Sequence, residues 1–337
     1  MTASKKDNDV LLILDISYVT YYICLSAVSR WKKQYYGTSL ETIELPEPGS
    51  VPYDELPDLV NDTFYFKKVL EETAIEKVSV ISRLLLEITG HVYSVANAGV
   101  NRVDTVIARD SRGTNFRNVI FPEYKVQRKT NREANNDFNH WKIFEHMYST
   151  VYPQLLPRDC TYTIMNPQAE GDDVIASLIQ SDFVRSRYRW VILISSDHDF
   201  CQLHRPENHL RQFTMDGDEV LCQYKHTSKG QKVAVPISAD LAMMLKIITG
   251  DKSDNIPGIK QRLGPCTAYK LLTEGDGKKN LQDLFEQNPE AKVAFNRNRK
   301  LIAFSEIPAD LQYEIVSDLK KKVGADDCRF CNSLNCQ

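Results

Sequence analysis

Residues 190–199 read Trp-Val-Ile-Leu-Ile-Ser-Ser-Asp-His-Asp, a short apolar run that ends in two carboxylates. A run of this length and composition is typical of a strand buried on both faces of a parallel sheet. Val10–Leu14 is a second such run, and it ends at Asp15. A further strand, expected over Asp104–Arg109, ends at Asp110. We therefore predict an α/β fold in which acidic residues follow the ends of several parallel strands.

The segments between these strands are expected to be mostly helical, because they are longer and their apolar residues recur at helical spacing. The expected helices cover Tyr18–Ser29, Phe64–Thr89, Asn139–Val151, Ala169–Ile179, Ser238–Thr249 and Thr267–Leu272. One more short strand is expected over Thr161–Met165. Strands that alternate with helices predict a central parallel sheet flanked by helices.

The alternation of strands and helices divides the chain into three parts. Residues 1–235 hold the strands, with a proline-rich surface insertion over 30–62 and a basic region within 111–150. Residues 236–320 are expected to form a smaller helical subdomain. Residues 321–337 are expected to be a C-terminal tail, either disordered or in contact with a partner protein.

Composition narrows the class of protein. Of the 337 residues, 42% are hydrophobic and 26% are charged, which is typical of a globular protein. We expect neither a membrane span nor a secretory signal, because no apolar run approaches the roughly 18 residues of a span and the N-terminus is polar. The eight cysteines are too sparse for a disulfide framework, so a reducing cytoplasm is the expected location. Three of them, Cys328, Cys331 and Cys336, offer one ligand too few for structural zinc.

The position of the acidic residues is the most informative feature. In an open α/β sheet the carboxyl ends of the strands form the crevice in which ligands bind. Asp15, Asp110, Asp197 and Asp199 are expected at that crevice, and Glu170 and Asp172 open a helix that follows a further strand. Asp173 is expected to point further away. Asp251 and Asp254 add a pair spaced i, i+3, which share one face if their turn is helical. Any one of them could instead be a turn residue or a helix cap, as Asp173 could be. It is their joint pattern that points to a site.

Clustered carboxylates raise one another's pKa unless cations neutralise them. Hard divalent cations such as Mg²⁺ or Mn²⁺ prefer oxygen ligands. Two such ions about 4 Å apart can activate water and stabilise the leaving oxygen of a phosphodiester. The acids therefore predict metal-dependent hydrolysis of a phosphate ester.

A basic segment over Ser111–Arg132 leaves the same strand end as Asp110. It carries six basic residues against one acidic residue, although the whole chain has a net charge of -3. Phe121 and Tyr124 are interleaved with these cations, as expected where unpaired nucleotides stack and phosphates are neutralised. Lys125 or Arg117 could then stabilise negative charge on a phosphoryl group. A solvated helix face or loop is the alternative.

Several of these motifs occur together in one known family. In chain order they are Asp15, Asp110, Phe116-Arg117, Tyr124–Arg128, Glu170-Gly-Asp-Asp173, Ser196–Asp199 and Gly250–Gly258 (Gly-Asp-Lys-Ser-Asp-Asn-Ile-Pro-Gly). In this order they resemble the flap endonuclease family of 5′-3′ exonucleases, and within it the RNase H branch of the T-even bacteriophages. The resemblance extends from about Leu11 to Leu319.

The resemblance implies a PIN-like nuclease domain with a helical arch and a helix-three-turn-helix subdomain. It implies a replication enzyme that degrades flaps, DNA and RNA–DNA hybrids from the 5′ end with two divalent ions. Asp15, Asp110, Glu170 and Asp172 would hold the first ion. The second would be surrounded by Asp173, Asp197, Asp199, Asp251 and Asp254.

Further roles follow from the same resemblance. Lys125 and Arg117 would meet the scissile phosphate, and the turn after Gly250 would grip duplex backbone, with K⁺ as a further ligand. The expected nucleic-acid contacts are Tyr124, Arg128, Lys129, Gly258, Lys260, Gly264 and Thr267. A monomer is expected, with a single-strand binding protein or a sliding clamp as a partner. Two departures from the family are Ile16, where glycine is usual, and the missing middle glycine between Gly258 and Gly264.

Two alternatives remain open from the sequence. A PIN-type ribonuclease that cuts single-stranded RNA would share the acidic pocket, but it would lack the duplex-binding turn at Gly250–Gly258. A non-catalytic binder of branched DNA would share the whole architecture, but it would not need every acid to be present.

Overall fold

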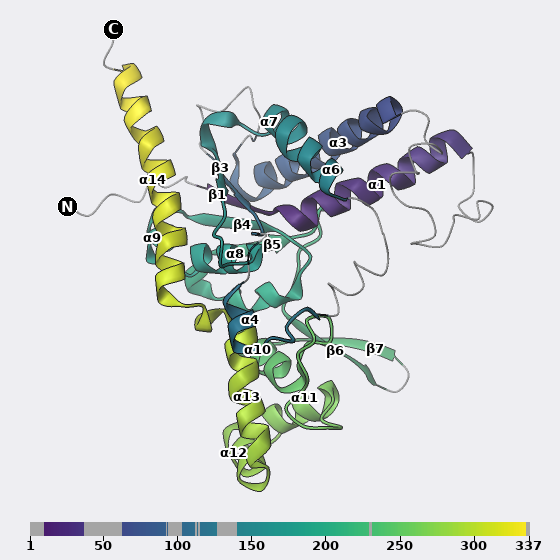
Figure 1. Ribbon diagram of the computed structural model, residues 1–337, viewed down its shortest axis with the longest axis vertical. Coiled ribbons are helices and arrows are strands. Elements are labelled where there is room, and N and C mark those ends of the chain that lie inside the picture. The colour runs from purple at the N-terminus through teal and green to yellow at the C-terminus, as the bar shows by residue number, and fades with distance from the viewer. Residues whose placement is uncertain are drawn as a thin grey trace.

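A computed structural model describes residues 10–36, 63–91, 93, 103–111, 113, 115–126, 140–228 and 231–334. Five strands form one parallel sheet in the order β3-β2-β1-β4-β5 (Figure 1). Their bounds are Val10–Asp15 (β1), Val103–Ala108 (β2), Thr161–Ile164 (β3), Trp190–Ile194 (β4) and Leu210–Phe213 (β5). The central strand is β1, in which Leu12 is paired with Thr105 on one side and Ile192 on the other.

Helices cover both faces of the sheet. On one face lie α1 (Ile16–Tyr36), α3 (Thr63–Thr89), α6 (His140–His146) and α7 (Tyr152–Leu155), the last two joined by a π-helical turn. On the other lie α8 (Gly171–Ile179), α9 (Asp182–Arg187) and α14 (Ala309–Leu334). Alternate residues of β1 point to opposite faces, so Leu12 and Leu14 join the first core while Leu11 and Ile13 join the second.

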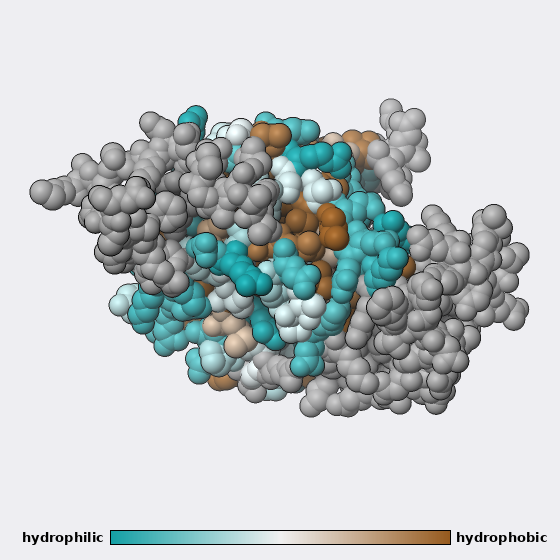
Figure 2. Space-filling model, turned by 90° about the horizontal axis from the view of Figure 1, so that it is seen from above, coloured by the Kyte–Doolittle hydropathy of each residue, from teal (hydrophilic) through white to brown (hydrophobic). Residues whose placement is uncertain are grey.

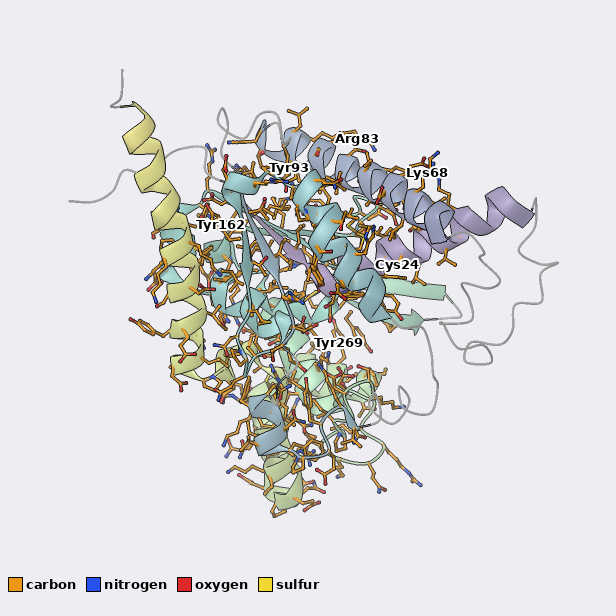
Figure 3. The ribbon with its side chains drawn as sticks, turned by 45° about the horizontal axis from the view of Figure 1, so that its top comes forward. Cys24, Lys68, Arg83, Tyr93, Tyr162 and Tyr269 are labelled. Carbon is orange, nitrogen blue, oxygen red and sulfur yellow. The ribbon has the colours of Figure 1, made fainter. Side chains whose placement is uncertain are left out.

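The chain after β5 builds a separate helical region at the foot of Figure 1. It consists of α10 (Ala239–Thr249), α11 (Pro265–Thr273), α12 (Gly277–Gln287) and α13 (Pro289–Ile302). An antiparallel hairpin of β6 (Gln223–Ser228) and β7 (Gln231–Pro236) precedes it. The ring of Tyr224 on this hairpin stacks on that of Tyr269, with centroids 4.2 Å apart, so the hairpin packs against α11. Tyr269 is labelled in Figure 3.

Several element boundaries differ from those expected. The three strands β5, β6 and β7 were not predicted, and the expected division at residue 235 falls inside β7. The expected insertion starts too early, because residues 31–36 still belong to α1; residues 37–62 lie outside the described part. Helix α14 continues past residue 321 because Leu319 and Val323 are buried in the core of the second face. Cys328 and Cys331 therefore lie on a helix rather than in an irregular tail.

Seen from the end opposite the helical region, the described surface is mostly hydrophilic, and its largest apolar area lies near the centre of the view (Figure 2). Among the described residues, the helices are all too short or too polar to cross a membrane.

Candidate functional site

The sheet order reverses at β1, since the chain passes to β2 and β3 on one side and to β4 and β5 on the other. Crevices at such a reversal are the usual ligand sites of open α/β sheets. Asp15 lies at the end of β1, and its Oδ2 accepts a hydrogen bond from Ser195 Oγ at 2.8 Å. The same hydroxyl oxygen accepts from the backbone N–H of Asp197 at 3.2 Å. Ser195 therefore joins the ends of the two strands and orients the carboxylate of Asp15.

Asp110, which follows β2, is held by two donors from other elements. Its Oδ2 accepts from Ser17 Oγ and its Oδ1 from the backbone N–H of Gly171, each at 2.7 Å. Gly171 is the first residue of α8, and a Cβ there would lie 3.2 Å from Asp110 Oδ1. A glycine thus allows the carboxylate to approach the N-terminus of α8, where the helix dipole favours negative charge.

Asp15, Asp172 and Asp197 lie close enough to influence one another's charge. Burial, together with Asp15 and Asp197, raises the pKa of Asp172 well above its ordinary value. Burial also raises the pKa of Asp15 to about 6, a shift that Asp110 and Asp197 increase and the Ser195 hydrogen bond opposes. The predicted grouping of acids from β1, β2, β4 and α8 is therefore present as a repelling cluster.

A second group of charges lies beside this cluster, and its central residue, Lys246, was missed from the sequence. Its Nζ pairs with Asp199 and, at 2.9 Å, with Asp251 Oδ2. Burial opposes the charge on Lys246, but these two carboxylates hold its pKa above the ordinary value. The sequence does contain one signal: Lys246 is the only charged residue between Asp240 and Asp251 along an otherwise apolar α10.

The two acids that contact Lys246 differ in their own pKa. Burial raises the pKa of Asp199 to about 6 in spite of the lysine. Burial opposes the charge on Asp251 as well, but hydrogen bonds from Lys246 and Ser253 lower its pKa to about 2. Asp251 and Asp254 do not share one face, since Asp254 instead accepts from the Tyr124 hydroxyl at 3.3 Å.

Glu170 is held by donors from the basic segment. Its Oε1 accepts from Asn115 Nδ2 at 2.9 Å and Lys125 Nζ at 2.8 Å, and its Oε2 accepts from the Tyr124 hydroxyl at 2.9 Å. Burial opposes ionisation, but Lys125 and Arg117 lower the pKa of Glu170 below its ordinary value. Lys125 also donates its backbone N–H to Asp254 O at 3.0 Å. The segment thus connects the sheet acids to the turn after α10.

Arg117 and Asp173 do not take the positions predicted for them. Arg117 lies on the short helix α4 (Phe116–Ile120) and is 4% exposed, while Asp173 is fully buried. Both guanidinium Nη atoms donate to the Asp173 carboxylate at 2.7 Å, and Nε donates to Leu301 O. A buried, bidentate pair of this kind leaves neither side chain free to meet a phosphate or a metal. Both predicted roles are corrected to structural ones.

Tyr124 also needs correction, because its side chain is buried and its hydroxyl is bonded to Glu170 and Asp254. It does not present an open ring for a base to stack on. Arg128 and Lys129 lie outside the described residues. Lys260 and Thr267 are exposed after α10, where the nucleic-acid contact was expected.

The turn at Gly250–Gly258 is shaped by its first glycine. Gly250 has a φ of +74°, and a Cβ there would lie 2.3 Å from the backbone oxygen of Ile256. Asp251 and Ile256 exchange two backbone hydrogen bonds of 2.8 and 2.7 Å across the turn. Only glycine accommodates both the positive φ and this close approach.

The acids do not form a ready coordination shell. Within the described ranges, no three or more His, Cys, Asp or Glu side chains are arranged so that they could hold a metal ion as they stand. The donor chemistry nevertheless fits a hard divalent cation, because the donors are carboxylates whose pKa values are raised mainly by burial and further by neighbouring carboxylates.

Comparison with known proteins identifies the family. Residues 64–233, half of the chain, match the family model described as the 5′-3′ exonuclease, N-terminal resolvase-like domain. The chain belongs to this family. The family inferred from the motifs is confirmed.

Relatives of this 5′-3′ exonuclease family member include a 5′-3′ exonuclease of Buchnera aphidicola, 28% identical over 58% of the chain and 61% of the relative. DNA polymerase I of Pseudomonas aeruginosa is 28% identical over 62% of the chain but only 22% of the polymerase. Ribonuclease H of Enterobacteria phage T4 is 25% identical over 71% of the chain and 77% of the relative. The chain thus spans about three fifths of the Buchnera exonuclease and about a fifth of the polymerase.

Solved structures share the fold. The T5 D15 protein co-crystallised with metal ions has a TM-score of 0.56 at 17% identity, covering 93% of this chain and 99% of that one. The T5 5′-exonuclease with bound zinc ions has a TM-score of 0.54 at 19% identity, covering 93% and 98%. The predicted α/β, PIN-like fold is confirmed.

Proposed function

We propose that this protein is a divalent-metal-dependent 5′ nuclease that hydrolyses phosphodiester bonds in flap, DNA and RNA–DNA substrates during replication. The observation that carries the proposal is the repelling cluster of Asp15, Asp172 and Asp197 where the sheet order reverses. The names of its relatives support it, since they include 5′-3′ exonucleases and a ribonuclease H. So does a related T5 flap endonuclease whose structure contains DNA and metal ions.

The acids proposed to hold the two ions fall into two groups. Asp15, Asp110, Asp172 and Asp197 are the proposed ligands on the sheet side, together with Glu170. Asp199, Asp251 and Asp254 are the proposed ligands on the side of α10. When bound, two divalent ions would supply an activated water and stabilise the leaving 3′ oxygen. Mg²⁺ is the proposed physiological ion, with Mn²⁺ as a substitute.

The protein's own contribution is to orient its acids and place cations beside them. Ser195 and Ser17 fix the carboxylates of Asp15 and Asp110 by hydrogen bonds. Lys125 and Lys246 are partly exposed and already face acids of the site. A phosphate that enters between them would compete with Glu170 and Asp199 for these ammonium groups, which could then stabilise charge on the phosphoryl oxygens.

The duplex is proposed to lie against the exposed start of α11. Lys260 and Thr267 are exposed there, and main-chain groups of the turn between Gly258 and Gly264 could meet phosphates, with K⁺ as a further ligand. The protein is proposed to act as a monomer and to meet a single-strand binding protein or a sliding clamp. These partners rest on the family resemblance and not on a feature of the described residues.

A labelled flap duplex tests the function. The wild-type protein with Mg²⁺ is expected to cut near the junction, and both EDTA and Asp197→Asn are expected to abolish cutting. Asp310→Asn, at an exposed position on α14 outside the site, serves as the matched control and should cut as the wild type does. Tight binding without cutting under Mg²⁺ or Mn²⁺ would favour the non-catalytic binder of branched DNA.

The same assay separates the ribonuclease alternative. A PIN-type ribonuclease would degrade a single-stranded RNA oligonucleotide at least as fast as the flap duplex. The exposed turn after α10 predicts the opposite preference, because it offers a surface for duplex phosphates that a single-strand enzyme does not need.

A further inference from the structure

Arg109 lies at the edge of the acidic cluster. It follows β2 directly and precedes Asp110, so the Cα atoms of these two residues are about 3.8 Å apart. Its backbone N–H donates to Ile164 O at 3.0 Å and continues the pairing of β2 with β3. Its side chain is partly exposed, and within the part of the chain that the structure describes its guanidinium forms no ion pair.

Three other cations of the site already have carboxylate partners. The pairs are Arg117 with Asp173, Lys125 with Glu170, and Lys246 with Asp199. A phosphate that binds one of these three cations has to displace a carboxylate. A phosphate that binds Arg109 displaces none, so this guanidinium can receive an anion without the loss of an ion pair.

The Arg109 side chain is held on an aromatic ring. Its Cζ lies over the ring of Tyr148, 4.5 Å from the centroid. Tyr148 belongs to the π-helical turn η2 (Met147–Val151), and π-helical turns occur frequently at functional sites. A guanidinium that lies over an aromatic face keeps its N–H donors at its rim, where they can bind a phosphate bidentately.

Tyr148 is itself fixed by its neighbours. Its ring centroid lies 6.0 Å from that of Phe144 and 5.9 Å from that of Tyr152. Tyr152 is buried, and its hydroxyl shares a hydrogen bond of 2.7 Å with the hydroxyl of Thr20 on α1. The three rings thus form a row along α6, η2 and α7 that is anchored on α1. A guanidinium held on such a ring loses less conformational entropy when it binds an anion.

The alternation of side chains along β2 shows on which side of the acids Arg109 lies. Ile107 joins the core on the face of α1, α6 and α7, whereas Ala108 joins the core on the face of α8. Arg109 points to the first face, where it meets Tyr148, and Asp110 points to the second, where it accepts from the N-terminus of α8. A strand that meets the acids with one phosphate can therefore meet Arg109 with a neighbouring phosphate.

We propose that Arg109, held by Tyr148, binds a phosphate of the cleaved strand next to the phosphate that meets the acids. This inference rests on the proposed function, because it places the reacting phosphate at the acidic cluster. The ligand is a phosphodiester strand with at least two consecutive phosphates. The contact is independent of base identity, since it involves only the backbone of the nucleic acid.

Binding measurements in the Asp197→Asn background test the contact on an intact substrate. By fluorescence anisotropy with a labelled flap duplex and Mg²⁺, Arg109→Gln should raise Kd about tenfold. It should also lower the slope of log Kd against log salt by about 0.7–0.9, the contribution of one phosphate. Tyr148→Leu should raise Kd as well, whereas Tyr148→Phe, which keeps the ring, should not. Arg158→Gln, at an exposed position just before β3, is the matched control and should change neither quantity.

Neutral linkages identify the phosphate. A methylphosphonate, in which a methyl group replaces a charged phosphate oxygen, is placed at one linkage at a time along the cleaved strand. At one linkage near the junction it should weaken binding to the Arg109 protein but cause little further loss with Arg109→Gln. Additive losses at every linkage, or an unchanged salt slope, would overturn the proposal. If the wild type binds the flap but cuts nothing, the nuclease proposal fails, and the same comparison still decides the contact.

Discussion

Arg117 and Asp173 form a bidentate ion pair in the protein interior, with two N–O distances of 2.7 Å. Asp173 also accepts from the backbone N–H of Glu170, and Arg117 donates to Leu301 O. The pair therefore joins α4, the start of α8 and the end of α13. A guanidinium in the basic segment thus stabilises the architecture around the site.

Loss of one partner of this pair should be strongly destabilising. We expect Arg117→Met to lower the free energy of unfolding by about 3–5 kcal/mol, because Asp173 would remain as an uncompensated buried charge. Urea denaturation followed by circular dichroism measures this change. Arg83→Met, at an exposed position on α3, is the matched control and should change stability by less than about 0.5 kcal/mol. An equal, small effect of both substitutions would contradict the structural role of the pair.

Gly250 and Gly275 offer a matched comparison of backbone strain and steric clash. Both have positive φ, +74° and +68°, but only at Gly250 would a Cβ meet another atom, 2.3 Å from Ile256 O. Gly275→Ala should therefore cost about 1–2 kcal/mol of stability, the ordinary penalty for alanine in a left-handed conformation. Gly250→Ala should cost clearly more and should also weaken flap cleavage, because it displaces Asp251. Thermal denaturation of both variants decides this, and equal losses would argue against the clash.

The metal-free protein should become more stable as the pH falls from 7.5 to 5. Asp15 and Asp199 have folded-state pKa values raised to about 6, so protonation favours the folded state. Their stabilising contribution is complete below about pH 4, the pKa of an unfolded aspartate, and is lost as the pH rises through 6. The lowered pKa values of Asp251 and Glu170 act below this window.

Urea unfolding in EDTA at several pH values measures this dependence. In Asp15→Asn it should be weaker, since one of the acids with a raised pKa is gone while Asp172 and Asp199 remain. Saturating Mg²⁺ should raise stability most at pH 7.5, where the carboxylates are ionised and binding does not have to displace protons. A flat profile in EDTA would show that the acids do not repel one another as the structure indicates.

The ammonium group of Lys246 lies between Asp199 and Asp251 and neutralises part of their charge. Its removal should therefore make the stability of the protein depend more strongly on bound metal. We expect Lys246→Met to lower the melting temperature in EDTA, because two partly buried carboxylates lose their neutralising partner. Mg²⁺ should then raise the melting temperature more than it does in the wild type, by mass action on the folded state. Lys252→Met, an exposed position in the adjacent turn, should leave both values unchanged. An unchanged Mg²⁺ response in Lys246→Met would show that this group does not share the metal-facing site.

The sequence was most informative where a local pattern determines structure. The apolar run of β4 and the acids at Asp15, Asp110 and Asp197 were predictable because strand ends in a parallel sheet meet at one edge. The direction of a side chain on a short helix is set by tertiary packing instead. The sequence could not show that Arg117 turns inward to Asp173, or that Lys246 reaches across to Asp199. The edge strand β5 and the hairpin escaped prediction because their residues are polar and lack a clear alternation.

The link through Lys125 has a consequence for how substrates are told apart. Its backbone N–H donates a hydrogen bond to Asp254 in the turn, and its side chain donates one to Glu170 beside the sheet. Two hydrogen bonds of one residue therefore connect the turn to the acids. A nucleic acid that displaces the turn will disturb Glu170 as well, whereas one that touches only the sheet edge will leave it tied to the lysine. Discrimination between substrates would then depend on whether one nucleic acid contacts the turn and the sheet edge at the same time. A short fragment that reaches only one of them would be a poor substrate, even if its scissile bond fitted the site.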